Sequence, residues 1–366
     1  MMNSVAHMRV LVLTRYSDLG ASSRLRFFQY YPLLSKSGVE LVTHCLISNK
    51  LLKKRYRVGS YGFCPIFRAY FKYLINLLKC RSFDIVWVEK ELLPWSPLWF
   101  EKLLLLDSTY VLDYDDAVFH NYDLHPSKLV RLIYGKKLDG LMAGASLVVC
   151  GNEYLAKRAK AAGASRVQIM PTVIDLGRYK FESKELNLLV EGKLPMRIVW
   201  VGTPSTEKYL KLLIEPLQNL AKTHNFVLRL IGVSNFEIPG VSIELVEWSE
   251  ESEFKDIAAC DIGIMPLLNT PWECGKCGYK LIQYMASGLP IVASNVGVNS
   301  QIVKSGINGY LVDTPSGWIE SLGELLDNRG MRIEMGLAGR QSVEQEYSVQ
   351  KQGHKFIRLL RAIANK

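Results

Sequence analysis

Short apolar runs alternate with stretches of helical periodicity along the first half of the chain. The runs at residues 10–14 and 39–46 indicate buried strands. Further short strands are expected at residues 84–88, 110–112 and 146–150. Between the first two, apolar side chains recur at helical spacing over residues 24–37, where Pro32 is expected to kink a helix. This alternation predicts a parallel sheet with helices on both faces, an α/β fold.

The same pattern restarts in the second half of the chain. Six more strands are expected, at residues 197–201, 227–232, 241–246, 262–265, 291–293 and 309–312. The two halves therefore predict two Rossmann-like domains. Their expected bounds are 1–180 and 197–345, with a linker at 181–196 and a C-terminal helix, 346–366, that crosses back to the first domain.

One segment of the second half has the pattern of an anion site. A strand at 262–265 precedes a polar, glycine-rich loop at 273–278, which leads into a helix. Backbone N–H groups at such a helix start meet anionic ligands, and Lys276 and Lys280 add positive charge there. The segment is typical of a place that holds a diphosphate.

Composition places the chain among ordinary globular proteins. Its 366 residues suffice for two domains, with 49% apolar and 22% charged residues. No apolar run approaches the ~18 residues of a spanning helix. The N-terminus lacks the layout of a cleavable signal, and Met8 is an alternative start.

The seven cysteines are scattered and form no disulfide framework, which fits a reducing cytosol. Cys274 and Cys277 have the spacing of a redox or zinc pair. No second CxxC pair accompanies them. We therefore favour a tight loop beside a ligand over redox or metal chemistry.

Positive charge is concentrated in the first half. Residues 1–180 carry 26 Lys and Arg against 14 Asp and Glu, a net charge of +12, whereas residues 181–366 carry 19 against 21, a net charge of −2. Within the first half, residues 50–81 interleave basic and aromatic side chains, which predicts a surface for anionic membranes. An ordinary amphipathic helix is the alternative, with four apolar side chains inward: Phe67, Tyr70, Phe71 and Leu74. Nucleic acid is not expected, because no recognition module accompanies the charge.

Several segments, in order, resemble the family 4 glycosyltransferases of the GT-B fold, and within them a bacterial surface-polysaccharide subgroup. The segments are Ser-Leu-Val-Val-Cys-Gly-Asn-Glu-Tyr-Leu at 146–155, Met-Pro-Thr-Val-Ile-Asp at 170–175, Ala-Ser-Gly-Leu-Pro-Ile-Val-Ala-Ser at 286–294 and Ile-Asn-Gly-Tyr-Leu-Val at 307–312. The resemblance implies two Rossmann-like domains facing an interdomain cleft, with a nucleotide-sugar donor in the C-terminal domain and an acceptor in the N-terminal one. It also implies retention of anomeric configuration, with no cofactor and no metal.

The donor residues follow from this resemblance, with departures. The family's paired glutamates fall on Gly275 and Gln283, and its arginine falls on Thr203. Gln283 would still hydrogen-bond a ribose hydroxyl, without the strength of a charged partner. Glu273 stands nearby and would take over sugar contact. The full expected donor set is Gly202, Thr203, Lys208, Glu273, Gly275, Lys276, Lys280 and Gln283.

In the first domain, two groups of residues are candidates. A small-residue loop is expected to approach the acceptor or a phosphate, or else to cap a helix with Ser22 or Ser23; it comprises Gly20, Ser22, Ser23 and Arg24. Four carboxylates follow predicted strands and are expected to orient the acceptor or act as its base: Glu89, Glu91, Asp115 and Asp116. Mg²⁺ binding by the aspartates, or an Asp-capped helix start, remains as an alternative.

These expectations describe a cytoplasmic enzyme, peripheral on the inner face of the cell membrane. It would move a sugar from a nucleotide-sugar to a lipid-linked or polysaccharide acceptor in surface-polysaccharide biosynthesis (lipopolysaccharide, O-antigen or capsule). A second hypothesis is a degenerate GT-B module that binds nucleotide or glycan without turnover. A dinucleotide oxidoreductase is disfavoured, because the first loop lacks the GxGxxG pattern.

Overall fold

The computed structural model describes residues 8–179 and 195–364, which form two units. The first unit comprises residues up to Val173, the segment Gly275–Cys277 and the chain from Val349 onward. The second comprises Ile174–Cys274 and Gly278–Ser348. Most of the linker predicted at 181–196 lies outside the described residues, and Met196 already begins a strand.

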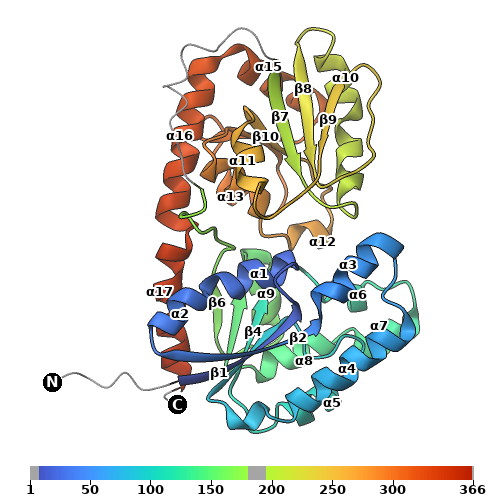
Figure 1. The fold of residues 1–366 in the computed structure, drawn as a ribbon, viewed down its shortest axis with the longest axis vertical. Coiled ribbons are helices and arrows are strands. Elements are labelled where there is room, and N and C mark those ends of the chain that lie inside the picture. The colour runs from blue at the N-terminus through green and yellow to red at the C-terminus, as the bar shows by residue number, and fades with distance from the viewer. Residues whose placement is uncertain (1–7, 180–194, 365–366) are drawn as a thin grey trace, which may run out of the picture. The chain divides into compact units, whose positions relative to one another are not determined.

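The first unit is built on a six-stranded parallel sheet (Figure 1). Its order is β2-β1-β3-β4-β5-β6. The strands are β1 (Met8–Tyr16), β2 (Val39–Ile47), β3 (Ile85–Glu89), β4 (Tyr110–Tyr114), β5 (Leu147–Cys150) and β6 (Val167–Ile169). All of β3, β4 and β5 is buried, as expected of parallel strands covered on both faces. The chain changes direction across the sheet between β1 and β3, where ligands bind in open α/β sheets.

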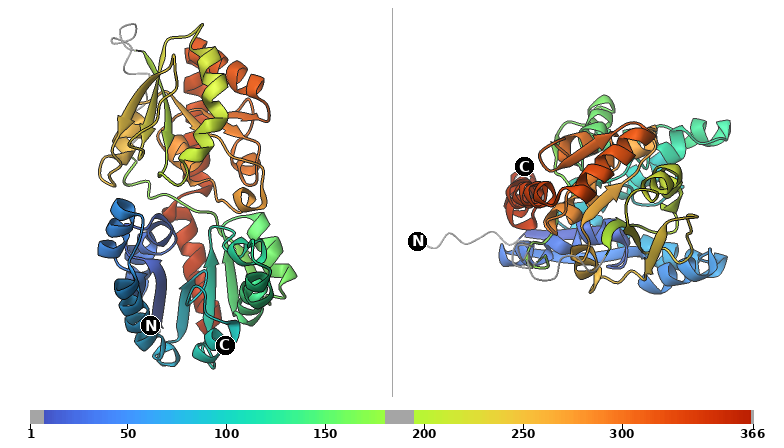
Figure 2. Two further views of the ribbon diagram at one scale, coloured as in Figure 1. Left: turned by 90° about the vertical axis from the view of Figure 1, so that its right-hand side faces the viewer. Right: turned by 90° about the horizontal axis from the view of Figure 1, so that it is seen from above.

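Short helices cover this sheet. They are α1 (Ala21–Arg26), α2 (Tyr31–Lys36), α3 (Asn49–Val58), α4 (Phe63–Leu77), α5 (Leu98–Leu104), α6 (His120–Asp123), α7 (Lys128–Tyr134), α8 (Lys137–Gly144) and α9 (Glu153–Ala161). Helix α4 packs on β2, at one edge of the sheet, and α9 packs on β5 and β6, at the opposite end of the strand order (Figure 2).

The single kinked helix predicted at 24–37 is wrong. The chain forms α1, a 3-10 turn at Phe28–Tyr30 and then α2. Pro32 lies at the start of α2, where backbone N–H groups have no partner within the helix, so the N–H that proline lacks is not needed. It therefore begins a helix rather than bending one.

The C-terminal helix α17 (Val349–Ala364) belongs to the first unit. Its Phe356 is fully buried, with its ring 4.6 Å from that of Trp87 and 5.6 Å from that of Tyr30. Because Trp87 lies on β3, the last helix of the chain completes the core beneath a central strand.

The second unit contains a parallel sheet of order β12-β11-β10-β7-β8-β9. The strands are β7 (Met196–Val201), β8 (Phe226–Ile231), β9 (Ser242–Val246), β10 (Ile262–Met265), β11 (Ile291–Ser294) and β12 (Gly309–Val312). In chain order this is the Rossmann arrangement, with its switch point between β7 and β10. The six strands predicted for this half are all present.

The helices of the second unit are α10 (Ile214–Leu220), α11 (Glu253–Ala258), α12 (Pro271–Cys274), α13 (Tyr279–Ala286), α14 (Asn299–Ile302), α15 (Pro315–Asp327) and α16 (Arg329–Glu346). A 3-10 helix, Glu207–Leu213, precedes α10. The loop predicted at 273–278 is partly helical, because α12 occupies its start. None of the helices in the described part of the chain is long and apolar enough to cross a membrane.

The packing of α17 generates a stability prediction. Phe356→Ala should lower the free energy of unfolding by about 3–5 kcal/mol, because it empties the space beneath Trp87. Urea unfolding followed by circular dichroism measures this change. Arg358→Ala, an exposed site on the same helix, is the matched control. Equal midpoints for the two variants would contradict the packing described for α17.

Candidate functional site

In the first unit, polar side chains meet at the carboxyl ends of β1, β3 and β4. Glu89 is the last residue of β3 and is only 1% exposed. Its Oε2 accepts hydrogen bonds from Ser23 Oγ at 2.6 Å and from the Arg15 backbone N–H at 2.8 Å. Glu89 therefore ties the start of α1 to the end of β3, at the sheet's switch point.

Lys90 follows β3 and places a cation among these groups. Its Nζ lies 2.7 Å from Asp115 Oδ1 and 3.9 Å from Asp116 Oδ2, and it donates a hydrogen bond to Ser22 Oγ at 3.0 Å. Glu89 Oε1 lies 4.0 Å away. We call Glu89, Asp115 and Asp116 the carboxylate cluster. A Mg²⁺ ion bound by the two aspartates would have to lie in this cluster, where the Lys90 ammonium supplies positive charge.

The two aspartates differ in their electrostatics. Burial acts to raise the pKa of Asp115, but the nearby Lys90 ammonium outweighs it and the pKa lies below its ordinary value. Burial also raises the pKa of Asp116, and the adjacent Asp115 charge adds to this, so the pKa remains above its ordinary value despite Lys90. Such a split suits one fixed anion and one group that exchanges protons.

A second buried ion pair supports α1 from below. Arg26 Nε lies 2.8 Å from Asp113 Oδ1, and both side chains are almost fully buried. Burial raises the pKa of Asp113 to about 6, which leaves it ionised near neutral pH. Arg26 also donates to the carbonyl of Met170 at 2.9 Å. These contacts fix α1, and with it Ser22 and Ser23.

Other predicted residues of the first unit have structural partners. Neither serine caps α1: Gly20 is the N-cap residue and no side chain bonds there. A Cβ at Gly20 would lie 2.3 Å from that of Tyr16, so the chain needs glycine here. Arg24 donates to the carbonyl of Asp18 at 3.2 Å.

Glu91 is not part of the carboxylate cluster. It accepts a hydrogen bond from Tyr122 at 2.8 Å and pairs with the buried Lys137 ammonium at 2.7 Å. Lys137 also lies 2.7 Å from Glu101. The expectation of an Asp-capped helix start is wrong, because α6 begins after Phe119 rather than after Asp115 or Asp116.

The segment Gly275–Cys277, which belongs to the first unit, adjoins Asp116. Lys276 Nζ lies 3.8 Å from Asp116 Oδ1, and the Lys276 carbonyl accepts a hydrogen bond from Asn152 at 2.8 Å. A Cβ at Gly275 would lie 2.4 Å from that of Ala117, so a larger residue would not fit here. The Cys277 thiol donates to the carbonyl of Asp115 at 3.0 Å.

In the second unit, Glu273 is held by a set of donors. The Tyr209 hydroxyl donates to its Oε1 at 2.5 Å, Thr270 donates to its Oε2, and Lys208 Nζ lies 4.0 Å from Oε1. Burial acts to raise the pKa of Glu273, but the hydrogen bonds from Thr270 and Tyr209 outweigh it and the pKa is lowered. Glu273 is therefore a fixed anion, whereas Lys208 remains largely exposed.

Lys280 and Gln283 lie on α13. Lys280 Nζ is 4.2 Å from the ring centroid of Trp200, a cation–π distance, and Trp200 lies on β7. Gln283 is only 1% exposed and donates to the Tyr179 hydroxyl at 3.1 Å. The helix starts after Gly278, which has φ +65°, a conformation that favours glycine.

Gly202 and Thr203 form the turn after β7. The Gly202 N–H donates to the carbonyl of Ile231 at 2.9 Å. Thr203 is exposed, and its hydroxyl lies 2.9 Å from that of Ser205. This turn places hydroxyl groups beyond the carboxyl end of β7.

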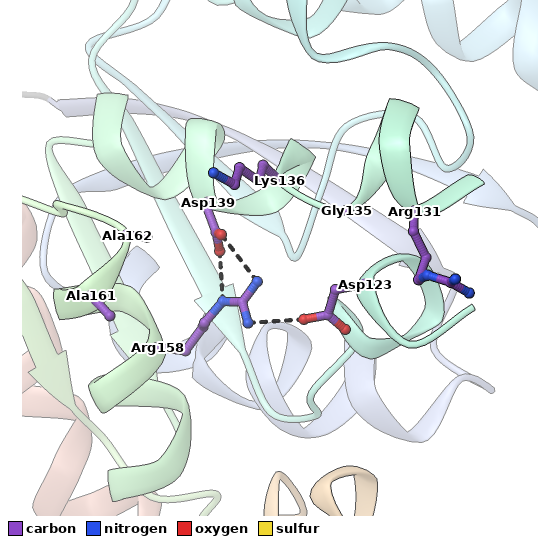
Figure 3. Close-up of a pocket in the computed structure, with 8 residues that line it drawn as sticks. All are labelled: Asp123, Arg131, Gly135, Lys136, Asp139, Arg158, Ala161 and Ala162. Atoms are coloured by element: carbon purple, nitrogen blue, oxygen red, sulfur yellow. Dashed lines mark hydrogen bonds and ion pairs between the residues drawn. The ribbon is translucent and has the colours of Figure 1, made fainter. Parts of the chain in front are cut away.

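A cavity of about 490 Å³ lies elsewhere in the first unit, among α7, α8 and α9 (Figure 3). Across it, Arg158 binds Asp139 through Nε at 2.6 Å and Asp123 through a terminal nitrogen at 2.9 Å. Its lining contains none of the predicted site residues. Its acidic groups are already paired with Arg158, so it is not a candidate active site.

Several functional candidates escaped sequence reasoning. Lys90, Tyr209 and Thr270 contact predicted residues but were not among the predicted site residues. The sequence signal for Lys90 was its place as a basic residue between Glu89 and Glu91 at a strand end. Among the described residues, no group of three or more His, Cys, Asp or Glu side chains is placed to hold a metal ion.

The family comparison matches residues that lie mostly in the second unit. Residues 195–328 match the family model described as "Glycosyl transferases group 1". A stretch of 109 residues, 29% of this chain, is 32% identical to the D-inositol 3-phosphate glycosyltransferase of Paenarthrobacter aurescens. The chain spans about a quarter or less of the length of the curated relatives it matches.

Solved structures match nearly the whole chain. Sucrose-phosphate synthase from Thermosynechococcus elongatus has a TM-score of 0.74 at 13% identity, over 97% of this chain and 99% of that one. Anabaena HepE in complex with UDP-glucose has a TM-score of 0.66 at 15% identity, over 97% and 100%. With the two parallel sheets, these likenesses show a two-domain, Rossmann-like GT-B fold.

The geometry of Cys277 makes a labelling prediction. Burial raises the pKa of this thiol well above its ordinary value, which disfavours the reactive thiolate. Timed alkylation of the native protein, read by mass spectrometry, should label the exposed Cys64 early and the buried Cys277 late. Denatured protein, in which all seven cysteines should react, is the control. A disulfide between Cys274 and Cys277 under mild oxidation would instead support the redox interpretation.

Proposed function

We propose that this protein is a glycosyltransferase that moves a sugar from a nucleotide-sugar donor to an acceptor hydroxyl. The supporting observation is that the family match, residues 195–328, covers the greater part of the second unit. At the carboxyl edge of that unit's sheet stand Lys208, Glu273 and Lys280. The GT-B fold and the matched relatives point to the same reaction class.

The second unit is the proposed donor domain. Transfer releases a nucleoside diphosphate, whose charge must be met by cations and backbone N–H groups. Lys208 is exposed for this purpose, and Lys280 stands in the first turn of α13. The turn at Gly202 and Thr203 would approach the nucleotide.

Glu273 and Gln283 are the proposed sugar and ribose contacts. Glu273 is held as an anion by Tyr209 and Thr270 and would accept hydrogen bonds from sugar hydroxyls. Gly275 and Lys276 were expected in the donor loop but belong to the first unit, where Lys276 faces Asp116. No metal or cofactor is proposed, since lysine side chains would neutralise the leaving group.

The first unit is the proposed acceptor domain. Asp116 is the more exposed aspartate, with 31% of its side chain accessible against 13% for Asp115. It is proposed to accept the proton of the acceptor hydroxyl. Glu89 with Ser22 and Ser23 would orient the acceptor, while Gly20, Arg24 and Glu91 shape the surrounding loops. Retention of configuration is proposed from the family resemblance alone.

A lipid-linked acceptor at the cytoplasmic face of the membrane is proposed from the surface of α3 and α4. Phe63, Phe67 and Phe71 are 82%, 63% and 59% exposed, one turn apart along α4. The alternative that packs Phe67 and Phe71 inward is therefore wrong; Tyr73 and Leu77 are the buried side chains. Exposed basic residues accompany this stripe, namely Lys53, Lys54, Arg55, Arg57, Arg68 and Lys72. Such a surface suits anionic lipid and would serve surface-polysaccharide assembly.

A second candidate is a GT-B module that binds its ligand without turnover. Gly275 and Gln283 replace the family's two carboxylates, and the Gln283 amide is already engaged by Tyr179. This candidate predicts nucleotide binding with no product from any donor.

Lysine variants test the transfer proposal. Lys280→Ala and Lys208→Ala should each lower kcat/KM on the order of 10²-fold or more, because the leaving diphosphate loses a counter-charge. Transfer is measured as nucleoside diphosphate released in the presence of acceptor-bearing membranes. Lys211→Ala, an exposed site on the same 3-10 helix as Lys208, is the control. Unchanged kinetics in both test variants would refute these phosphate roles.

Vesicle sedimentation tests the membrane surface. The wild-type protein should bind vesicles rich in phosphatidylglycerol and release them as salt rises, because salt screens the basic charges. Phe67→Ser combined with Phe71→Ser should reduce this binding by removing two exposed aromatic anchors. Ile307→Ser, which alters an exposed apolar residue of the second unit, is the control. Equal binding by all three proteins would contradict the assignment of α4.

A further inference from the structure

We propose that Lys90 is a positioning residue for the transfer reaction: its ammonium clamps Asp115 against Ser22 and so presents Asp116 to the acceptor hydroxyl. This inference rests on the proposed function. It adds a residue that no motif identifies, and it assigns different tasks to the two aspartates.

The backbone at Lys90 is the first support. Lys90 has φ +67°, in the left-handed region that long side chains seldom adopt. Its N–H donates to the carbonyl of Asp113 on the neighbouring strand β4 at 3.0 Å. This turn immediately after β3 lets the side chain reach the residues that follow β4. Unusual backbone conformations of this kind gather at functional sites.

The burial of Lys90 is the second support. The side chain is only 6% exposed, so its charge must be met within the protein. The polar groups that face it come from three elements: Ser22 from α1, Glu89 from β3, and Asp115 and Asp116 from the chain after β4. One cation thus serves three carboxylates, whereas a purely structural pair needs only one.

The exposed fractions of the three carboxylate side chains indicate a different role for each. Glu89 is buried and bonded to Ser23, and Asp115 is mostly buried and makes the shortest contact with Lys90. Asp116 is the most exposed and lies farther from the ammonium, at 3.9 Å. Lys276 faces Asp116 at 3.8 Å, and the buried Arg26–Asp113 pair lies behind the cluster. Lys90 therefore anchors Asp115, while Asp116 remains accessible to a ligand.

The test compares Lys90→Gln with Lys90→Arg, which keeps the charge. The pH dependence of kcat/KM is measured for each. Without the ammonium, both aspartates should ionise at higher pH, so the acid limb of the Lys90→Gln profile should move upward. Its kcat/KM should also fall on the order of 10- to 100-fold at neutral pH. Lys90→Arg should keep the wild-type limb, and Lys90→Gln combined with Asp115→Asn should be no worse than the more impaired single variant.

Thermal unfolding across pH gives a readout independent of activity. Asp115 has a lowered pKa in the folded protein, so its pairing stabilises the fold above its unfolded pKa and is lost as pH falls through the folded value. The Tm difference between wild type and Lys90→Gln should therefore shrink at acidic pH. A constant difference would indicate a role in shape alone and overturn the inference.

The outcomes separate this inference from the proposed function. An active wild type whose acid limb is unchanged in Lys90→Gln would overturn the inference and leave the transferase proposal standing. A wild type that binds nucleotide but transfers no sugar from any donor would overturn both. A shift of the acid limb to higher pH in Lys90→Gln, together with an unshifted limb in Lys90→Arg, would support the assignment.

Discussion

Each sheet consists of parallel strands whose central members are buried on both faces, so their carboxyl ends gather at one edge. Polar side chains that must meet a ligand have to stand at that edge, because the faces are filled by apolar packing. In the first unit this constraint brings Ser23, Glu89 and Asp115 together from segments far apart in sequence. In the second unit the same constraint places Trp200, near the end of β7, against Lys280 and beside the turn at Gly202.

Gathering carboxylates at a partly buried edge creates an electrostatic problem. Carboxylates held close together disfavour one another's ionised forms. Lys90 offsets this repulsion, and Arg26 does the same for Asp113 below it. In the second unit, hydrogen bonds from Tyr209 and Thr270 stabilise the Glu273 charge. Both units thus hold fixed anions beside cations, an arrangement that suits sugar hydroxyls and a departing diphosphate.

The sequence was most informative where apolar runs are short and bounded by turn residues. All six strands of the second sheet were predicted for this reason, whereas β6 was missed because its three residues, Val167–Ile169, are only half-buried. The role of Lys90 could not be derived from the sequence, since it depends on a left-handed backbone and on partners such as Ser22, 68 residues away. Likewise, helical spacing could not show which face of α4 is covered, and Phe67 proved exposed.

Thermal unfolding with added nucleotides tests whether the second unit binds a nucleotide-sugar. The ligands are UDP, GDP, dTDP and their common sugar conjugates, with CMP and NAD as controls. A ligand at about 100 times its Kd adds about 2.7 kcal/mol of stability. The Tm should rise with one nucleoside diphosphate and its sugar conjugates and should not change with CMP or NAD. A Tm shift with NAD alone, or no shift with any nucleotide, would contradict nucleotide-sugar binding by the second unit.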